Sequence, residues 1–72
     1  MTEGEYRVGV DFNPSNNPDV VLVKEGAALL IDMMHTLAES GGTGAREAAV
    51  AATHFETAAM WAVKALTKKD RY

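Results

Sequence analysis

The chain has 72 residues and can form only one small domain, and a domain of this size buries only about 60% of the surface of its unfolded chain. It contains no cysteine and two widely separated histidines, so we expect neither disulfides nor a metal site to stabilise it. Association with further copies of the chain is the remaining route to stability. The net charge of −3 argues against a general nucleic-acid binder. No apolar run approaches the roughly 20 residues that span a bilayer, so the sequence predicts a soluble, cytoplasmic protein.

Residues 6–12 alternate between apolar and polar side chains, and Asn13 and Pro14 then break the pattern. Period two is typical of a short strand with one apolar face. A lone strand has unpaired backbone groups, so in one interpretation it pairs with another protomer. In the other interpretation the segment is an extended N-terminal arm, whose aromatic side chains Tyr6 and Phe12 drape over a helix.

Residues 18–39 are predicted to form the first helix. Asn17 can cap it, Pro18 suits the first helical position, and Asp19 suits the positive N-terminus. Apolar side chains at heptad-like spacing form a packing seam, made of Val20, Val23, Ala27, Leu30, Met34 and Leu37. Further apolar residues fall outside this seam and indicate contacts beyond a two-helix hairpin: Val21, Leu22, Leu29, Ile31 and Met33.

Residues 40–44 form a glycine-rich turn, and residues 45–68 are predicted to form the second helix. Gly41 can take the left-handed conformation that ends a helix, and Thr43 or Gly44 can start the next one. The second helix is apolar on nearly all sides, and its inner face is predicted to carry Ala48, Ala52, Phe55, Ala59, Ala62 and Leu66. The predicted fold is therefore a single mainly α domain over residues 1–72, an antiparallel two-helix hairpin. A short N-terminal strand or arm precedes it, and the chain is assembled as a homo-oligomer.

No set of residues has the spacing of a catalytic site or a nucleotide fingerprint, so we expect no enzymatic activity and no cofactor. Arg46 follows the glycine-rich turn at a helix start, where backbone amides attract anions. It is either solvated, part of an oligomer interface, or an anion ligand. Lys24 is either solvated or pairs with a phosphate. Trp61 lies away from the inner seam and either anchors a subunit interface or offers a flat face to a planar ligand.

Two parts of the chain resemble a known family. One part comprises residues 7–15, 23–24 and 28–32, and the other comprises residues 46–47, 51–56 and 59–65, which include the distinctive run AMWAVKA. Over residues 6–67 they resemble the helical-hairpin family of phage proteins that sequester the cyclic-nucleotide signals of bacterial immunity, the anti-CBASS and anti-Thoeris sponges.

The resemblance implies a non-enzymatic anti-defence protein of the host bacterial cytoplasm, which forms compact homo-oligomers with a hexamer as the expected size. It implies binding of cyclic di- or trinucleotides, or cyclic ADP-ribose derivatives, in pockets between protomers, and no DNA or membrane partner. Phosphates need arginine or lysine, and bases need aromatic faces. The candidate ligand-binding residues chosen on this chemistry are Arg46, Lys24 and Arg7 for phosphate, Tyr6, Phe12 and Trp61 for stacking, and Asn13 and Thr53 for polar edges.

An alternative function remains open at this point. The same hairpin could serve as a structural or protein-interaction module, which uses its apolar faces only for assembly or for a protein partner and has no small-molecule ligand. A small DNA-binding regulator is disfavoured by the acidic charge balance.

Overall fold

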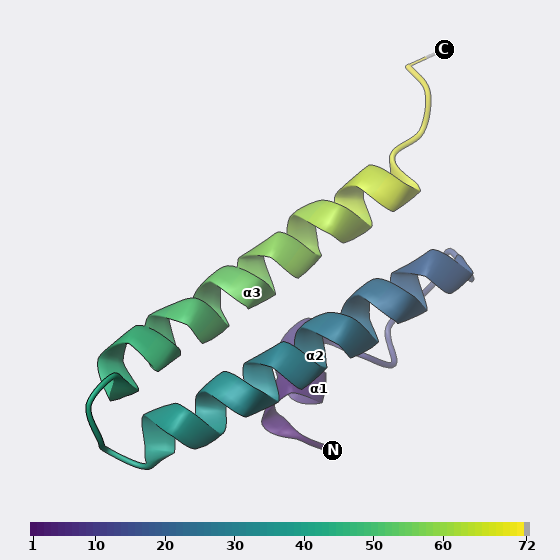
Figure 1. The fold of residues 1–72 in the computed structure, drawn as a ribbon. Coiled ribbons are helices and arrows are strands. Elements are labelled where there is room, and N and C mark those ends of the chain that lie inside the picture. The colour runs from purple at the N-terminus through teal and green to yellow at the C-terminus, as the bar shows by residue number, and fades with distance from the viewer. Residues whose placement is uncertain (72) are drawn as a thin grey trace.

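The computed structural model describes residues 1–71 and contains three helices, α1 (Glu3–Val8), α2 (Pro18–Glu39) and α3 (Ala45–Thr67). α2 and α3 run antiparallel as a hairpin, and α1 lies against α2 near its middle (Figure 1). The molecule measures 50 × 24 × 13 Å, and its thinnest dimension is close to the diameter of one helix, about 10–12 Å. Few residues are therefore covered on all sides. None of the helices within residues 1–71 combines the length and apolarity needed to cross a membrane.

The N-terminal element is a helix, so the predicted N-terminal strand is wrong. A capping box starts α1: Glu5 N donates to the Thr2 hydroxyl over 3.1 Å, and Thr2 N donates to the Glu5 carboxylate over 2.8 Å. Gly9, in the left-handed conformation at φ 64°, ends the helix. These local signals outweigh a short alternation of apolar residues. The draped arm is wrong as well, because Tyr6 and Phe12 are 74% and 70% exposed.

The two long helices begin where their capping residues predict. The Asn17 side chain accepts a hydrogen bond from Asp19 N over 2.8 Å, with Pro18 at the start of the helix. In the turn, Gly41 and Gly44 adopt positive φ values of 69° and 95°, and Gly44 directly precedes α3. α2 has the predicted bounds, and α3 ends one residue before its predicted end.

The core is small and lies where α2 faces α3 and α1. Its buried apolar residues are Val20, Ala28, Ile31, Ala48, Ala52 and Ala59. The three buried alanines of α3 belong to the predicted inner face, whereas Leu66 of that face is 36% exposed. The predicted seam of α2 is only partly right, because Leu30 and Leu37 are exposed while Ala28 and Ile31 are buried. The cause is α1, which covers a side of α2 that a two-helix hairpin would leave open.

α1 docks on α2 through Gly4. The backbone N–H of Gly4 donates to Asp32 Oδ1 over 2.7 Å. A Cβ atom at Gly4 would lie 2.1 Å from the carbonyl oxygen of Ala28. The close approach of the two helices therefore requires a residue without a side chain at this position.

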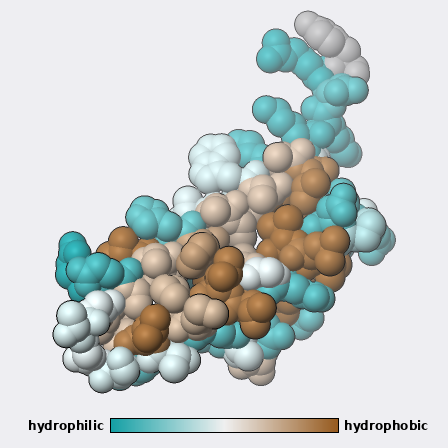
Figure 2. Space-filling model, in the orientation of Figure 1, coloured by the Kyte–Doolittle hydropathy of each residue, from teal (hydrophilic) through white to brown (hydrophobic). Residues whose placement is uncertain are grey.

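One face of α2 remains uncovered in the single chain. Its large apolar side chains form an outer stripe, defined as Leu22, Leu29, Met33 and Leu37, which are 67%, 69%, 57% and 51% exposed. These positions share one side of a helix. Apolar surface is open to view along both long helices (Figure 2). Contiguous exposed apolar surface on a small protein marks a place where something else binds.

Candidate functional site

A groove runs between the N-terminal segment and the C-terminal half of α3. It consists of two hollows of about 240 and 220 Å³ that share Lys24 and Val63, and we call it the Lys24 groove. Val8, Glu56, Ala59 and Met60 complete the lining of the first hollow, and Phe12, Asn13, Pro14, Ser15, Val20 and Thr67 complete that of the second. Residues far apart in the sequence thus meet around one side chain of α2.

Lys24 is the charged residue at the centre of this groove, and only 6% of it is exposed. It lies one turn after the buried Val20, so the helix directs it inward, toward the turn that follows α1. Its Nζ donates to the carbonyl oxygen of Gly9 over 2.9 Å and to that of Phe12. The Phe12 ring centroid lies 5.4 Å from Nζ, within the range of a cation–π contact. The solvated interpretation of Lys24 is therefore wrong.

No carboxylate within residues 1–71 forms an ion pair with Lys24. An ammonium group has three N–H donors, and the two carbonyl oxygens of Gly9 and Phe12 occupy two of them. One donor and the full positive charge remain without a counter-ion. Because a buried charge is costly unless it is paired, an anion that enters the groove would be stabilised at this atom.

Phe12 and Asn13, two further predicted ligand residues, line the second hollow. The Asn13 amide donates to Asn17 O over 3.0 Å and accepts from the Ser15 hydroxyl over 2.8 Å. Its polar atoms therefore hold the Asn-Pro-Ser turn in shape. The ring of Phe12 is largely exposed and stays available to a ligand.

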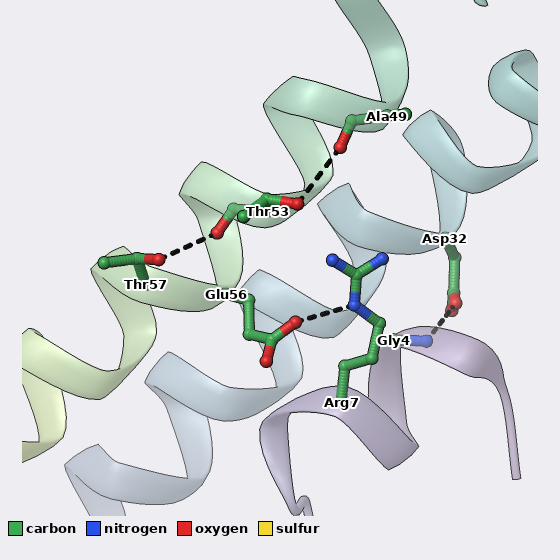
Figure 3. A network of polar contacts seen from close by, with 7 residues as sticks. All are labelled: Gly4, Arg7, Asp32, Ala49, Thr53, Glu56 and Thr57. Carbon is green, nitrogen blue, oxygen red and sulfur yellow. Dashed lines mark hydrogen bonds and ion pairs between the residues drawn. The ribbon is translucent and has the colours of Figure 1, made fainter. Parts of the chain in front are cut away.

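Arg7 connects α1 to α3. Its Nε donates to Glu56 Oε1 over 2.7 Å, with side chains that are 21% and 34% exposed (Figure 3). Glu56 also lines the first hollow, and sequence reasoning missed it as a site residue. No local signal marks Glu56, since its partner lies 49 residues away in the sequence. Tyr6, next to Arg7, is exposed on α1.

Trp61 lies beside the groove on the outside of α3. It is 65% exposed, and the Lys64 Nζ lies 5.1 Å from its ring centroid. These two residues and Met60 line a shallow hollow of about 260 Å³. Since Met60 also lines the Lys24 groove, the aromatic face and the groove adjoin.

Thr53 and Arg46 are not brought into the groove of the same chain. The Thr53 hydroxyl donates to Ala49 O over 3.3 Å, and Thr57 repeats this contact with Thr53 O over 3.0 Å (Figure 3). The Arg46 side chain is 83% exposed and lies 3.9 Å from Glu47. Along α3, Arg46 lies about 22 Å from the level of Trp61 at a rise of 1.5 Å per residue.

A larger hollow of about 700 Å³ lies on the other side of the N-terminal segment. Its lining includes four carboxylates, those of Glu5, Asp11, Glu25 and Asp32. An anionic ligand would be repelled there. Electrostatics therefore favours the Lys24 groove over the larger hollow for a phosphate-bearing ligand.

Comparison with known families agrees with the resemblance seen in the sequence. The family model described as "Acb2/Tad1, hairpin domain" matches residues 4–67, from α1 to the end of α3. No curated protein and no solved structure matches the chain. The proteins of this family bind their ligands rather than act as enzymes. The chain belongs to the Acb2/Tad1 hairpin family, the anti-CBASS and anti-Thoeris sponges.

Proposed function

We propose that this protein binds a cyclic nucleotide signal of bacterial immunity in the cytoplasm of the host and withholds it from the host effector without converting it. The ligand is a cyclic di- or trinucleotide or a cyclic ADP-ribose derivative. The observation that carries the proposal is Lys24, which is buried, lines both hollows of the groove and has no counter-ion within residues 1–71. Family membership supports the same conclusion.

The chemistry of the groove suits a nucleotide. A phosphate on Lys24 supplies the missing counter-charge, with a charge-assisted hydrogen bond to Nζ. Phe12, exposed at the rim, offers a face for base stacking, and Tyr6 on α1 is a second such face. Stacking of a base on an aromatic side chain is worth about 1–3 kcal/mol. Arg7 and Asn13 are the remaining candidates near the N-terminal segment.

The binding site is proposed to be completed by a second copy of the chain. Each hollow of the groove, at about 240 or 220 Å³, is smaller than typical small-molecule sites of about 300–1,000 Å³. The outer stripe gives each copy an apolar face for such an assembly. Arg46, Thr53 and Trp61 would then contribute from a neighbouring protomer. The proposed assembly is a compact homo-oligomer, with a hexamer as the expected size.

The experiment is a thermal-shift and calorimetry panel of cyclic dinucleotides, cyclic trinucleotides and cyclic ADP-ribose isomers, with linear nucleotides as controls. A ligand present at 100 times its dissociation constant stabilises the folded state by about 2.7 kcal/mol. Lys24→Met should abolish the shift. Lys68→Met, which removes the same charge from an exposed position, should retain it. Circular dichroism of both variants checks that the helices remain.

Sequestration adds a second requirement to this panel. After incubation and heat release, mass spectrometry should recover the bound nucleotide intact and in full. Absence of binding to every cyclic nucleotide would refute the proposal, and so would cleavage of the ligand.

The outer stripe also favours one other function, a helical-hairpin module that binds only further protein chains. In that case, the protein would self-associate or bind a protein while the nucleotide panel gave no shift. Lys24 braces the 9–12 turn under either function, but only an anionic ligand would also supply a counter-charge, which is why the nucleotide-binding function is preferred.

A further inference from the structure

Glu56 lines the Lys24 groove and uses one of its two carboxylate oxygens to pair with Arg7. Its Oε1 atom accepts from Arg7 Nε over 2.7 Å, while Oε2 has no hydrogen-bond partner among residues 1–71. Figure 3 shows this second oxygen directed away from Arg7. Glu56 and Lys24 line the same hollow. A ligand in this hollow therefore meets a cation and a carboxylate together.

The ion pair with Arg7 makes this carboxylate compatible with an anionic ligand. The charges of Glu56 and Arg7 offset each other across 2.7 Å, and no carboxylate in the described part of the chain pairs with Lys24. The groove thus has a net positive charge and still offers a directional acceptor. A matching ligand carries a phosphate for Lys24 and, beside it, adjacent N–H donors for Glu56. No acceptor atom of the ligand should face the Glu56 carboxylate.

We infer that Glu56 selects guanine among the bases of a cyclic dinucleotide, an inference that rests on the proposed function. The Watson–Crick edge of guanine carries two adjacent donors, N1–H and the 2-amino group. A carboxylate has about four lone-pair sites, so it accepts both donors while keeping the Arg7 contact. Adenine has one amino donor beside N1, which is an acceptor and would face a carboxylate oxygen. A site built around a donor–acceptor match rejects a base that leaves its acceptor unpaired.

The test is isothermal titration calorimetry with three ligands that differ only in the base: cyclic di-GMP, cyclic di-IMP and cyclic di-AMP. Hypoxanthine, the base of cyclic di-IMP, keeps N1–H but lacks the 2-amino group. We expect the wild-type protein to bind cyclic di-GMP about tenfold more tightly than cyclic di-IMP, because loss of the 2-amino group removes one hydrogen bond to a charged acceptor. Cyclic di-AMP should bind most weakly of the three.

Two variants separate base reading from a structural role. Glu56→Gln replaces one acceptor oxygen by an amide donor, so we expect the preference for guanine over adenine to fall to within about threefold. Arg7→Gln breaks the same ion pair but keeps the carboxylate. We expect it to weaken all three ligands and to leave their order unchanged.

The outcomes are distinct. Equal affinities of the wild-type protein for the three ligands would overturn the inference and leave the proposed function standing. A Glu56→Gln variant that weakens all three ligands by the same factor would overturn it too, since Glu56 would then act only by holding α1. If the wild-type protein binds a cyclic trinucleotide or a cyclic ADP-ribose but none of the three, the inference fails and sequestration survives. If it binds no cyclic nucleotide, both fail.

Discussion

Gly4→Ala tests the docking of α1 on α2. The new Cβ would lie 2.1 Å from Ala28 O and 2.8 Å from two further backbone atoms of Ala28. Contact distances between heavy atoms are about 3.5 Å, so α1 has to retreat by about 1.4 Å. The hydrogen bond from Gly4 N to Asp32 measures 2.7 Å and does not survive such a shift.

The magnitude follows from these contacts. A hydrogen bond to a charged acceptor contributes about 1.5–3 kcal/mol, and the partly exposed Arg7–Glu56 pair adds at most about 1 kcal/mol. The higher helix propensity of alanine returns about 1 kcal/mol. The docked state of α1 should therefore lose about 0.5–3 kcal/mol, while the α2–α3 hairpin keeps its contacts.

Amide hydrogen exchange measures this loss directly. Protection of residues 3–8 should fall in Gly4→Ala, by about tenfold for each 1.4 kcal/mol lost, with little change in α3. Gly26→Ala is the matched control, because no atom lies within 4 Å of its new Cβ. That variant should leave α1 protection unchanged. Unaltered protection of α1 in Gly4→Ala would refute the account of how the two helices meet.

Three further predictions follow from the same structure. Lys24→Met leaves the carbonyl oxygens of the 9–12 turn without their donor, so chemical denaturation should show that the free energy of unfolding falls by about 2 kcal/mol. An unchanged free energy of unfolding would mean that the ammonium group does not stabilise the turn. A double-mutant cycle of Arg7→Ala and Glu56→Ala should give a coupling of about 0.2–1 kcal/mol in unfolding experiments, and zero coupling would deny the ion pair in solution. Leu29→Lys should change the stability of the single chain by no more than about 0.5 kcal/mol, yet it should abolish self-association as measured by sedimentation velocity. The control variant Thr43→Lys, in the exposed turn, should assemble normally.

Much of the fold could be predicted because its signals are local. The cap formed by Asn17 and Pro18, and the glycines of the 40–44 turn, act through neighbouring residues. The error at the N-terminus has a local cause too. Thr2 and Glu5 form a capping box, but the alternation of apolar and polar residues that begins at Tyr6 predicted a strand instead.

The candidate site was harder to predict because it depends on contacts between distant segments. A lysine near a helix start is usually exposed, and the inward position of Lys24 depends on its contacts with Gly9 and Phe12 in the N-terminal segment. To predict the ion pair of Arg7 with Glu56, one has to know that the Arg7 side chain of α1 reaches α3. Three of the predicted ligand residues, Phe12, Asn13 and Lys24, line the same groove. Their binding of a ligand stays a prediction.

The buried face of α3 consists of three alanines, Ala48, Ala52 and Ala59. A larger side chain at a buried alanine forces the helices apart, so substitutions at these positions should be rare among related chains. Alanine is usually a residue that evolution exchanges freely, yet here it is expected to vary least. The exposed positions of α3 lack this packing constraint, so they can change while the hairpin stays the same.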